Sequence, residues 1–409
     1  MSEWQETTVD DLAPFSYGKG LPEAKRKANG QIPVYGSNGI VGFHDTPLTS
    51  GPTIIIGRKG SIGNVHFSPI PCWPIDTTFY VTGSDPSLIR YRYYLLSSVG
   101  FNHMNTDSAV PGLNRDAAHA RLIHSPKDEN EQRAIAHILG TLDDKIELNR
   151  RMNETLEGIA RALFKSWFID FDPVRAKAEG RQPFGMDEGT AELFPDQFED
   201  SELGEIPKGW VAGNLGDEFS ITMGQSPPGK SYNEDGEGIE FYQGRTDFGA
   251  RYPKPRVYCT APNRYANPGD TLVSVRAPVG DINIAHHMCC IGRGLAAVIH
   301  KSGRQSYTFC TMNSLHDSFK QFESEGTVFG CIGKDGFNSI KVVIPPDEVI
   351  AKFESLLSPV DLLIFVNHEN SNNLERMRNI LLPKLISGDI RIDASKFGFG
   401  QEGEKVGEV

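Results

Sequence analysis

The sequence lacks the features that would mark a membrane, secreted or zinc-binding protein. The apolar run at residues 362–366 is only five residues long, far short of the roughly 20 that cross a bilayer. The N-terminal stretch MSEWQETTVDDLAPF is acidic and holds no apolar signal core. The cysteines form no CxxC pair, which disfavours a zinc or disulfide framework; they are Cys72, Cys259, Cys289, Cys290, Cys310 and Cys331. We therefore expect a cytoplasmic protein with no membrane partner.

Sets of catalytic residues are also lacking. No nucleophile, base and orienting group occur at an informative spacing, and neither Pro-Pro pair fits a methyltransferase motif. The adjacent His286 and His287 would point to opposite faces of a strand, so they make a poor metal pair. We predict no catalytic residue and no metal ligand in this chain.

Residues 224–231, GQSPPGKS, match the P-loop pattern for nucleotide binding. That loop cradles phosphates with successive backbone N–H groups, which Pro227 and Pro228 lack. A helix must also follow the Lys-Ser pair, whereas the turn-like YNEDGEG follows here. A loop that exposes Lys230, Ser231, Tyr232 and Asn233 to DNA is the better interpretation.

The net charge of −12 argues at first against a polyanionic partner, but the acidity is unevenly distributed. Residues 1–125 hold 10 basic and 10 acidic side chains, and residues 206–345 hold 14 and 13. Residues 187–205 alone contain eight acids and no base. The two larger segments are therefore nearly neutral and could each present a basic face to nucleic acid.

Residues 128–173 carry apolar residues at steps of three and four, which predicts one face of a long helix. The positions are Ile135, Ile138, Leu139, Leu142, Ile146, Asn149, Met152, Leu156, Ile159 and Leu163. About 35 residues at 1.5 Å each give a helix roughly 50 Å long, which suits a coiled-coil arm.

A second copy of this stripe lies in residues 346–385. Each of its positions lies 218 residues after a position of the first stripe. The residues are Phe353, Leu356, Leu357, Val360, Ile364, Asn367, Leu374 and Leu381. Asn149 and Asn367 share one position. A buried asparagine there would fix the register of a helix pair at some cost in stability, and the alternative is that both face solvent.

The remaining segments are β-rich and related to each other. Short strands are predicted at residues 33–35, 53–57, 63–67 and 77–81, with a helix at 91–99. Residues 268–276 parallel residues 50–58 at the same offset of 218, which makes Arg276 the counterpart of Arg58. The chain is therefore a tandem repeat of an α+β module, each copy a β-rich unit followed by a long helix.

Two glycine-rich loops of the first β-rich unit could approach a ligand closely. They are residues 35–39, YGSNG, and residues 57–63, GRKGSIG, in which Arg58 and Lys59 could reach phosphate or guanine. The alternative is a tight hairpin with incidental charge. For Arg58 and Arg276 a shared structural role, such as pairing an acid, is equally open.

Three segments carry a family resemblance that covers nearly the whole chain. They are LFKSWFIDFDPV at the end of the first helix, LGEIPKGW at the start of the second β-rich unit, and LLPKLISGDIRI at the end of the second helix. With the half-chain repeat, they resemble the specificity subunit of type I restriction-modification enzymes.

The resemblance implies two β-rich target recognition domains separated by two long antiparallel coiled-coil helices with pseudo-twofold symmetry. The implied segments are recognition domain 1 (1–127), a spacer helix (128–173), an acidic linker (174–205), recognition domain 2 (206–346), a second spacer helix (347–395) and a flexible tail (396–409). Each domain would read one half of a bipartite, asymmetric double-stranded DNA site. The implied DNA-binding residues are Tyr35, Ser37, Asn38, Arg58, Lys59, Lys230, Ser231, Tyr232, Asn233, Gln243, Arg245 and Arg276.

The resemblance also implies partners: two methyltransferase subunits and two restriction subunits that translocate DNA with ATP. S-adenosylmethionine, ATP and Mg²⁺ would belong to those partners, and this chain would hold no cofactor. Two other functions stay open. Tight ATP binding abolished by Lys230→Ala would indicate a P-loop hydrolase, and DNA binding that ignores sequence would indicate an architectural coiled-coil adaptor.

Overall fold

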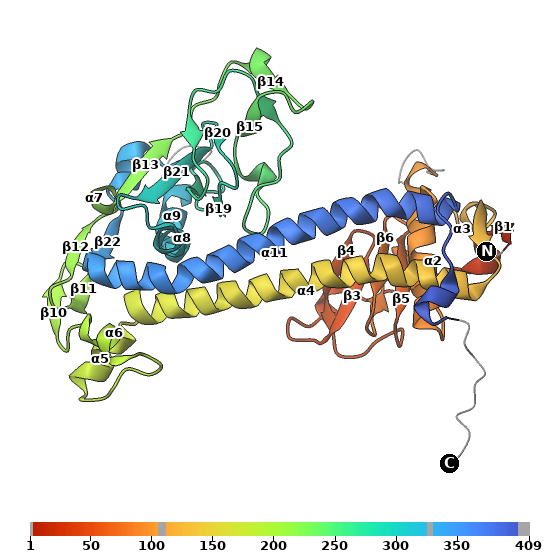
Figure 1. Cartoon of the computed structure of the whole chain (residues 1–409), viewed down its shortest axis with the longest axis horizontal. Coiled ribbons are helices and arrows are strands. Elements are labelled where there is room, and N and C mark those ends of the chain that lie inside the picture. Colours follow the sequence, from red (N-terminus) through yellow and green to blue (C-terminus); the bar gives the residue numbers. More distant parts are fainter. Residues whose placement is uncertain (1–2, 105–111, 325–329, 400–409) are drawn as a thin grey trace. The chain divides into compact units, whose positions relative to one another are not determined.

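The computed structural model describes residues 3–104, 112–324 and 330–399. The chain forms two compact units, one of residues 1–150 with 368–409 and the other of residues 151–367. Both long helices run through both units (Figure 1).

The first unit begins with a β-rich head, residues 3–126. Its strands are β1 (Trp4–Thr8), β2 (Ser16–Tyr17), β3 (Ile32–Gly36), β4 (Gly39–His44), β5 (Thr53–Gly57), β6 (Val65–Ser68), β7 (Trp73–Pro74), β8 (Thr78–Thr82) and β9 (Leu122–Pro126). Its helices are α1 (Val9–Leu12), α2 (Pro86–Ser98) and α3 (Arg115–His119), with 3-10 turns η1 (Glu23–Lys25) and η2 (Phe101–His103). The predicted strands and the predicted helix at residues 91–99 are confirmed.

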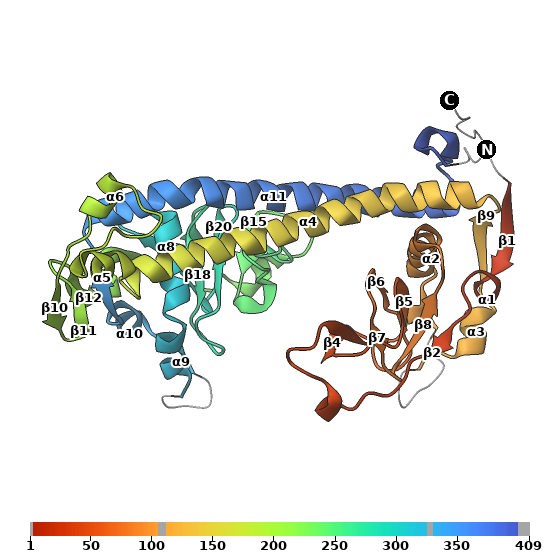
Figure 2. The same ribbon diagram turned by 90° about the horizontal axis from the view of Figure 1, so that it is seen from below.

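Three sheets build the first head, in the orders β2-β8-β5-β6, β4-β3-β7 and β1-β9. Ile54 and Ile56 of β5 are fully buried and pack with Phe79 and Val81 of β8. Asp85 caps α2 by accepting from two backbone amides, and Pro86 opens the helix where its missing N–H costs nothing. The apolar face of α2 covers the sheet (Figure 2).

The second head comprises residues 211–344. Its strands are β12 (Val211–Asn214), β13 (Phe219–Met223), β14 (Tyr232–Asn233), β15 (Ile239–Tyr242), β16 (Tyr258–Cys259), β17 (Tyr265–Ala266), β18 (Thr271–Ser274), β19 (Ile282–Ile284), β20 (Cys289–Ile291), β21 (Leu295–His300) and β22 (Lys341–Ile344). Its helices are α7 (Leu215–Glu218), α8 (Gln305–Ser314), α9 (His316–Ser324) and α10 (Lys334–Asn338), with 3-10 turns η3 (Gly229–Ser231) and η4 (Arg245–Asp247).

The two heads share most of their strand topology, although β14 and β17 of the second head have no counterpart in the first. The order β13-β21-β18-β19 repeats β2-β8-β5-β6, and β12-β22 repeats β1-β9. β15 pairs parallel with β20 as β3 pairs parallel with β7. The predicted α+β tandem repeat is confirmed.

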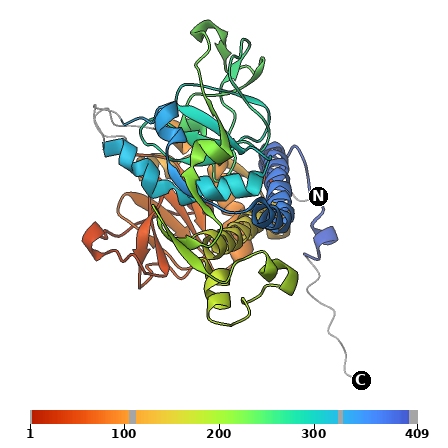
Figure 3. The same cartoon turned by 90° about the vertical axis from the view of Figure 1, so that its left-hand side faces the viewer.

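The long helices α4 (Glu129–Phe168) and α11 (Asp347–Ser387) pack side by side, as Figure 3 shows nearly end-on. In the first unit Asn149 Nδ2 donates to Ser371 Oγ at 3.2 Å, and Arg378 bonds Asp143 at 2.7 Å. The partner number on α11 rises as the number on α4 falls, so the helices are antiparallel there.

In the second unit Asn153 Nδ2 donates to the carbonyl of Ile364 at 3.2 Å, and Asn367 donates to Asn153 at 2.9 Å. Asn149 is 1% exposed and Asn367 is 5% exposed. Both asparagines therefore lie in the seam, and the solvent-facing alternative is wrong.

Two residues assigned to the apolar stripe do not belong to the seam. Ile159 is 54% exposed and Leu356 is 42% exposed. The contact between two paired helices is narrower than the apolar face of a single amphipathic helix. Apolar residues at the edge of that face therefore remain exposed to solvent.

Residues 174–205, predicted as a linker, instead form part of the second unit. They include most of α5 (Asp172–Ala178), α6 (Glu188–Glu192) and β10 (Phe198–Ser201), which pairs with β11 (Gly204–Pro207). Val174 and Phe194 are buried in the core beside Trp167 and Trp210. The acids lie on the outside of a segment anchored by a few apolar side chains.

Both long helices end earlier than predicted. α4 stops at Phe168 rather than residue 173, because Pro173 is tolerated only in the first turn of a new helix, here α5. α11 stops at Ser387 rather than at residue 395. The next residue, Gly388, has a φ of 83°, a left-handed conformation that commonly ends a helix. Residues 388–399 fold back on the first unit with a turn η5 (Ala394–Phe397), and residues 400–409 of the predicted tail lie outside the described residues.

No helix among the described residues has the length and apolar character needed to span a membrane.

Candidate nucleic-acid interface

Four loops meet at one end of the first head, where β2, β3 and β5 end and β8 begins. We call them the first tip loops: residues 18–20, 36–39, 57–64 and 75–77. The carbonyl of Thr77 joins them, because it accepts from Ser37 Oγ at 2.6 Å and from the amides of Arg58 and Lys59 at 2.9 and 3.1 Å. Gly57 allows this approach, since a Cβ there would lie 2.2 Å from the carbonyl oxygen of Ser61.

The second head has an equivalent group, the second tip loops: residues 224–226, 243–245, 274–281 and 292–294. Ser226 Oγ accepts from Gln243 Nε2 at 2.9 Å and from the amide of Arg293 at 3.3 Å. Arg245 forms an ion pair with Asp281 on the neighbouring loop. The two groups contain the same strand ends in the same order, so residue-by-residue comparison is possible.

Strand pairing makes Arg276 the counterpart of Lys59 and not of Arg58. Lys59 forms an isolated antiparallel bridge with Gly112, and Arg276 forms the same bridge with Cys331. The offset here is 217 residues rather than the 218 of the helices. The predicted equivalence of Arg58 and Arg276 is therefore wrong.

The hydrogen bonds on either side agree with this register. The carbonyl of Arg58 accepts from Leu113 at 2.9 Å, as the carbonyl of Val275 accepts from Ile332 at 3.0 Å. Val275 is 2% exposed and belongs to the core, so the position of Arg58 is an inward-facing one. A one-residue shift is hard to detect in a glycine-rich turn, because the aligned residues are alike at either offset. The shift nevertheless moves every side chain to the other face of the strand.

Arg58 accordingly braces the head. Its Nη1 donates to the carbonyl of Asp76 at 3.1 Å, and its guanidinium lies 5.1 Å from the ring centroid of Tyr17 and 5.7 Å from that of Phe79. The structural alternative is favoured for Arg58. Lys59 is exposed.

Comparisons with known proteins show what this chain is similar to. A family model described as the type I restriction modification DNA specificity domain matches residues 1–158. The MjaX type I restriction enzyme specificity subunit of Methanocaldococcus jannaschii is 34% identical over 269 residues, 64% of this chain and 58% of the relative. The MjaIX specificity subunit of the same organism is 25% identical over 361 residues, 83% of this chain and 78% of the relative. This chain is therefore similar to type I restriction-modification specificity subunits.

A solved structure shows the same fold. The crystal structure of a type I restriction-modification S subunit from M. genitalium aligns with a TM-score of 0.63 at 16% identity, over 94% of this chain and 96% of that chain. The aligned part of the MjaX relative is 58% of its length, so this chain spans less than two thirds of that relative.

The predicted DNA-binding residues of this chain differ in exposure. Six are exposed: Asn38, Lys59, Lys230, Gln243, Arg245 and Arg276. Three are buried, namely Tyr35, Ser37 and Ser231, and three are half-buried, namely Arg58, Tyr232 and Asn233. Tyr35 packs against Ile55 and Cys72, and burial raises the pKa of its phenol. All but Lys230, Ser231, Tyr232 and Asn233 lie in the tip loops or, for Tyr35, directly before one.

The segment from Lys230 to Asn233 forms a self-supporting loop outside the second tip loops. Ser231 Oγ donates to the carbonyl of Pro228, and Tyr232 stacks on Phe241 at 4.6 Å. Asn233 Oδ1 accepts from two amides of the following turn. Lys230 lies within the 3-10 turn η3, and strand β14 follows it instead of the helix that a P-loop requires. Lys230 is the member of this segment that is free to reach a ligand.

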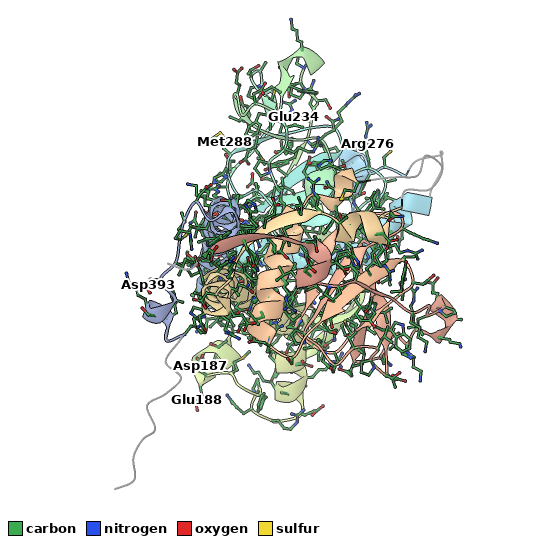
Figure 4. The ribbon with its side chains drawn as sticks, turned by 90° about the vertical axis from the view of Figure 1, so that its right-hand side faces the viewer. Asp187, Glu188, Glu234, Arg276, Met288 and Asp393 are labelled. Carbon is green, nitrogen blue, oxygen red and sulfur yellow. The ribbon has the colours of Figure 1, made fainter. Side chains whose placement is uncertain are left out.

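Two further exposed cations of the tip loops, Lys19 and Arg293, were not predicted from the sequence. Lys19 lies between Gly18 and Gly20 in the first tip loops, and Arg293 lies between two glycines in the second. Bracketing of a cation by glycines was the signal used for Arg58 and Lys59, and it would have found both. Figure 4 labels Arg276, whose side chain is exposed on the second head.

Proposed function

We propose that this chain is a specificity subunit that binds double-stranded DNA through the tip loops of both heads, each head reading one half of a bipartite, asymmetric site. One observation carries the proposal. Equivalent positions hold an exposed cation in both heads, Lys59 in the first and Arg276 in the second. Cations on a shared scaffold suit phosphate contacts, which position a protein without reading sequence.

The neighbouring equivalent positions differ in chemistry. Asn38 of the first head corresponds to Arg245 of the second, and Asp76 corresponds to Arg293. Asparagine pairs well with adenine and arginine with guanine in the major groove. Two heads with one scaffold and different side chains at its tip suit two different half-sites.

The same proposal includes assembly with methyltransferase and restriction subunits. Apolar side chains are exposed along α11 in each unit, at Leu362, Leu363 and Val366 in one and Met377 and Ile380 in the other. Such exposure on a helix supports docking of another protein. In this proposal the partner subunits carry out methylation and cleavage, and they bind S-adenosylmethionine, ATP and Mg²⁺. The assembled complex works in the cytoplasm.

The test is to map methylated sites genome-wide in cells that carry the intact system with wild-type or altered specificity subunit. Asn38→Ala should relax one half-site and Arg245→Ala the other, each by about 1–3 kcal/mol at one base pair. Arg245→Ala also leaves the Asp281 carboxylate without its ion pair, and that charge would repel DNA. The double variant with Asp281→Asn removes the repulsion, so any remaining effect reports the loss of the base contact of Arg245. Lys27→Ala, a surface cation paired with Asp45, is the control.

Methylation that follows no bipartite sequence in the wild type would refute the proposal. So would loss of discrimination at the same half-site in both variants. An unchanged pattern in Asn38→Ala and in Arg245→Ala would refute the assignment of the tip loops.

A further inference from the structure

One buried arginine of the second unit contacts the second head and both long helices. Arg251 lies in the loop between η4 and β16 and is 5% exposed. It forms an ion pair with Asp361 on α11, and its Nη1 lies 3.6 Å from Glu157 Oε1 on α4. Its guanidinium carbon is 4.4 Å from the ring centroid of Phe309 in α8. One side chain therefore joins three elements.

A cavity of about 400 Å³ borders Arg251 and is lined from α11 by Glu354, Asp361 and Phe365. Its other walls come from the head, where Tyr252 packs on Phe365 with ring centroids 6.2 Å apart. An apolar core that includes Phe164, Phe353 and Tyr307 also joins the head to both helices. The ion pairs of Arg251 add a polar and directional contact to this apolar attachment.

Both helices contain a weakening residue at this level. Gly158 follows Glu157, and a Cβ on it would meet no atom within 4 Å, so packing does not demand glycine there. Pro359 lies inside α11, two residues before Asp361, and removes a helical hydrogen bond. Asn153 lies opposite Ile364, so in an antiparallel pair the next turn brings Gly158 opposite Pro359.

The first head is attached in another way. Arg90 of α2 forms a bidentate pair with Asp144 of α4 at 2.7 and 2.9 Å and also bonds the carbonyl of Gly140. Arg251 lies in the long loop between β15 and β16, whereas the equivalent antiparallel strands of the first head, β3 and β4, are joined by residues 37 and 38 alone. The contact of Arg251 is thus no part of the duplicated scaffold.

We propose that Arg251 is a positioning residue that fixes the second head on the helix pair where α4 and α11 are intrinsically weakest. It thereby orients the second tip loops for their half-site, and this last step rests on the proposed function. Glu157 and Asp361 are the acceptors. Burial raises the pKa of Glu157, and the nearby cations Arg251 and Arg161 oppose that rise.

Hydrogen exchange of the full-length chain tests the attachment without reference to DNA. In Arg251→Met, amides of residues 151–160 and 355–366 should exchange roughly tenfold faster or more, since a buried pair has been broken. Amides of β18 and β21 should keep wild-type rates, which shows that the head remains folded. Lys254→Met removes the same charge from the same loop at an exposed position and should change these rates less than twofold.

A triple variant, Arg251→Met with Glu157→Gln and Asp361→Asn, guards against simple unfolding by two unpaired carboxylates. It should retain the fast exchange of the helices with an intact head. Wild-type rates in both Arg251→Met and the triple variant would overturn the proposal.

The second measurement is the methylation pattern of the intact system. Arg251→Met should raise methylation at sites mismatched in the half read by the second head at least fivefold, with no change for the other half. Faster exchange with an unaltered pattern would overturn the positioning role. If the wild type methylates no bipartite site, the proposed function fails, while the exchange rates still decide whether Arg251 holds the head.

Discussion

Replacing Arg391 should destabilise the first unit, because it leaves a buried carboxylate without its cation. The side chain of Glu131 is 2% exposed, and it accepts from Arg391 Nε at 2.9 Å and from Nη2 at 3.1 Å. The same guanidinium lies 5.3 Å from the ring centroid of Trp4. This cluster ties β1, the start of α4 and the segment after α11 together.

The magnitude follows from the unequal burial of the pair. Breaking a buried ion pair costs about 3–5 kcal/mol. The Arg391 side chain is 26% exposed, so most of the cost comes from stranding Glu131. We expect Arg391→Met, which keeps the stem over Trp4, to lower the unfolding free energy of the first unit by about 3 kcal/mol. That corresponds to roughly 150-fold faster exchange of the most protected amides.

Native-state hydrogen exchange separates the two units within one molecule. Amides of β5 report on the first unit, and amides of β18 in the second unit serve as the internal reference. Arg391→Met combined with Glu131→Gln should recover at least half of the lost protection, since the stranded charge is gone. Less than threefold faster exchange in the single variant, or no recovery in the double variant, would refute this reasoning.

Three further predictions concern single residues. Lys59→Ala should weaken DNA binding and reduce the magnitude of the salt slope by about one, without changing thermal stability; Arg58→Ala should instead lower the melting temperature of the first head, and equal behaviour of the two variants would contradict their assignment. Gly158→Ala should raise the unfolding free energy by about 0.5–1 kcal/mol in urea titrations, and a loss would mean that glycine is needed there. Asn149→Leu should leave the stability of the helix pair unchanged or higher in melts followed by circular dichroism, although it removes the hydrogen bond to Ser371. A loss above about 2 kcal/mol would show that this hydrogen bond outweighs the cost of burying the asparagine.

The sequence sufficed to predict the helices and the duplication, because both depend on periodicity. The seam from Ile135 to Leu163 repeats at steps that only a helix can place on one face. Strands such as β5 were recognisable from apolar residues between glycine and proline. These signals are local, so no tertiary information was needed.

What could not be predicted depends on contacts between distant segments. Phe194 and Val174 anchor an acidic stretch whose composition alone suggested a linker. The true counterpart of Arg276 emerged only from the bridges of Lys59 and Arg276 to strands far along the chain. Of the predicted site, the loops after β3 and β5 come together, whereas Tyr35 and Ser231 serve the core and their own turn.

The duplicated module separates what the two heads share from what each has alone. Strand order, the bridges of Lys59 and Arg276 and the buried seam asparagines are common to both copies. Tip side chains differ, and so do the polar contacts with the helices, since Arg90 bonds α4 and Arg251 bonds both helices. Under the proposed function, each head would depend on its own attachment as well as its tip, because a base contact made by a misoriented loop loses most of its discrimination. Exchange of tip residues alone between heads should transfer less specificity than exchange of a head with its attaching residues.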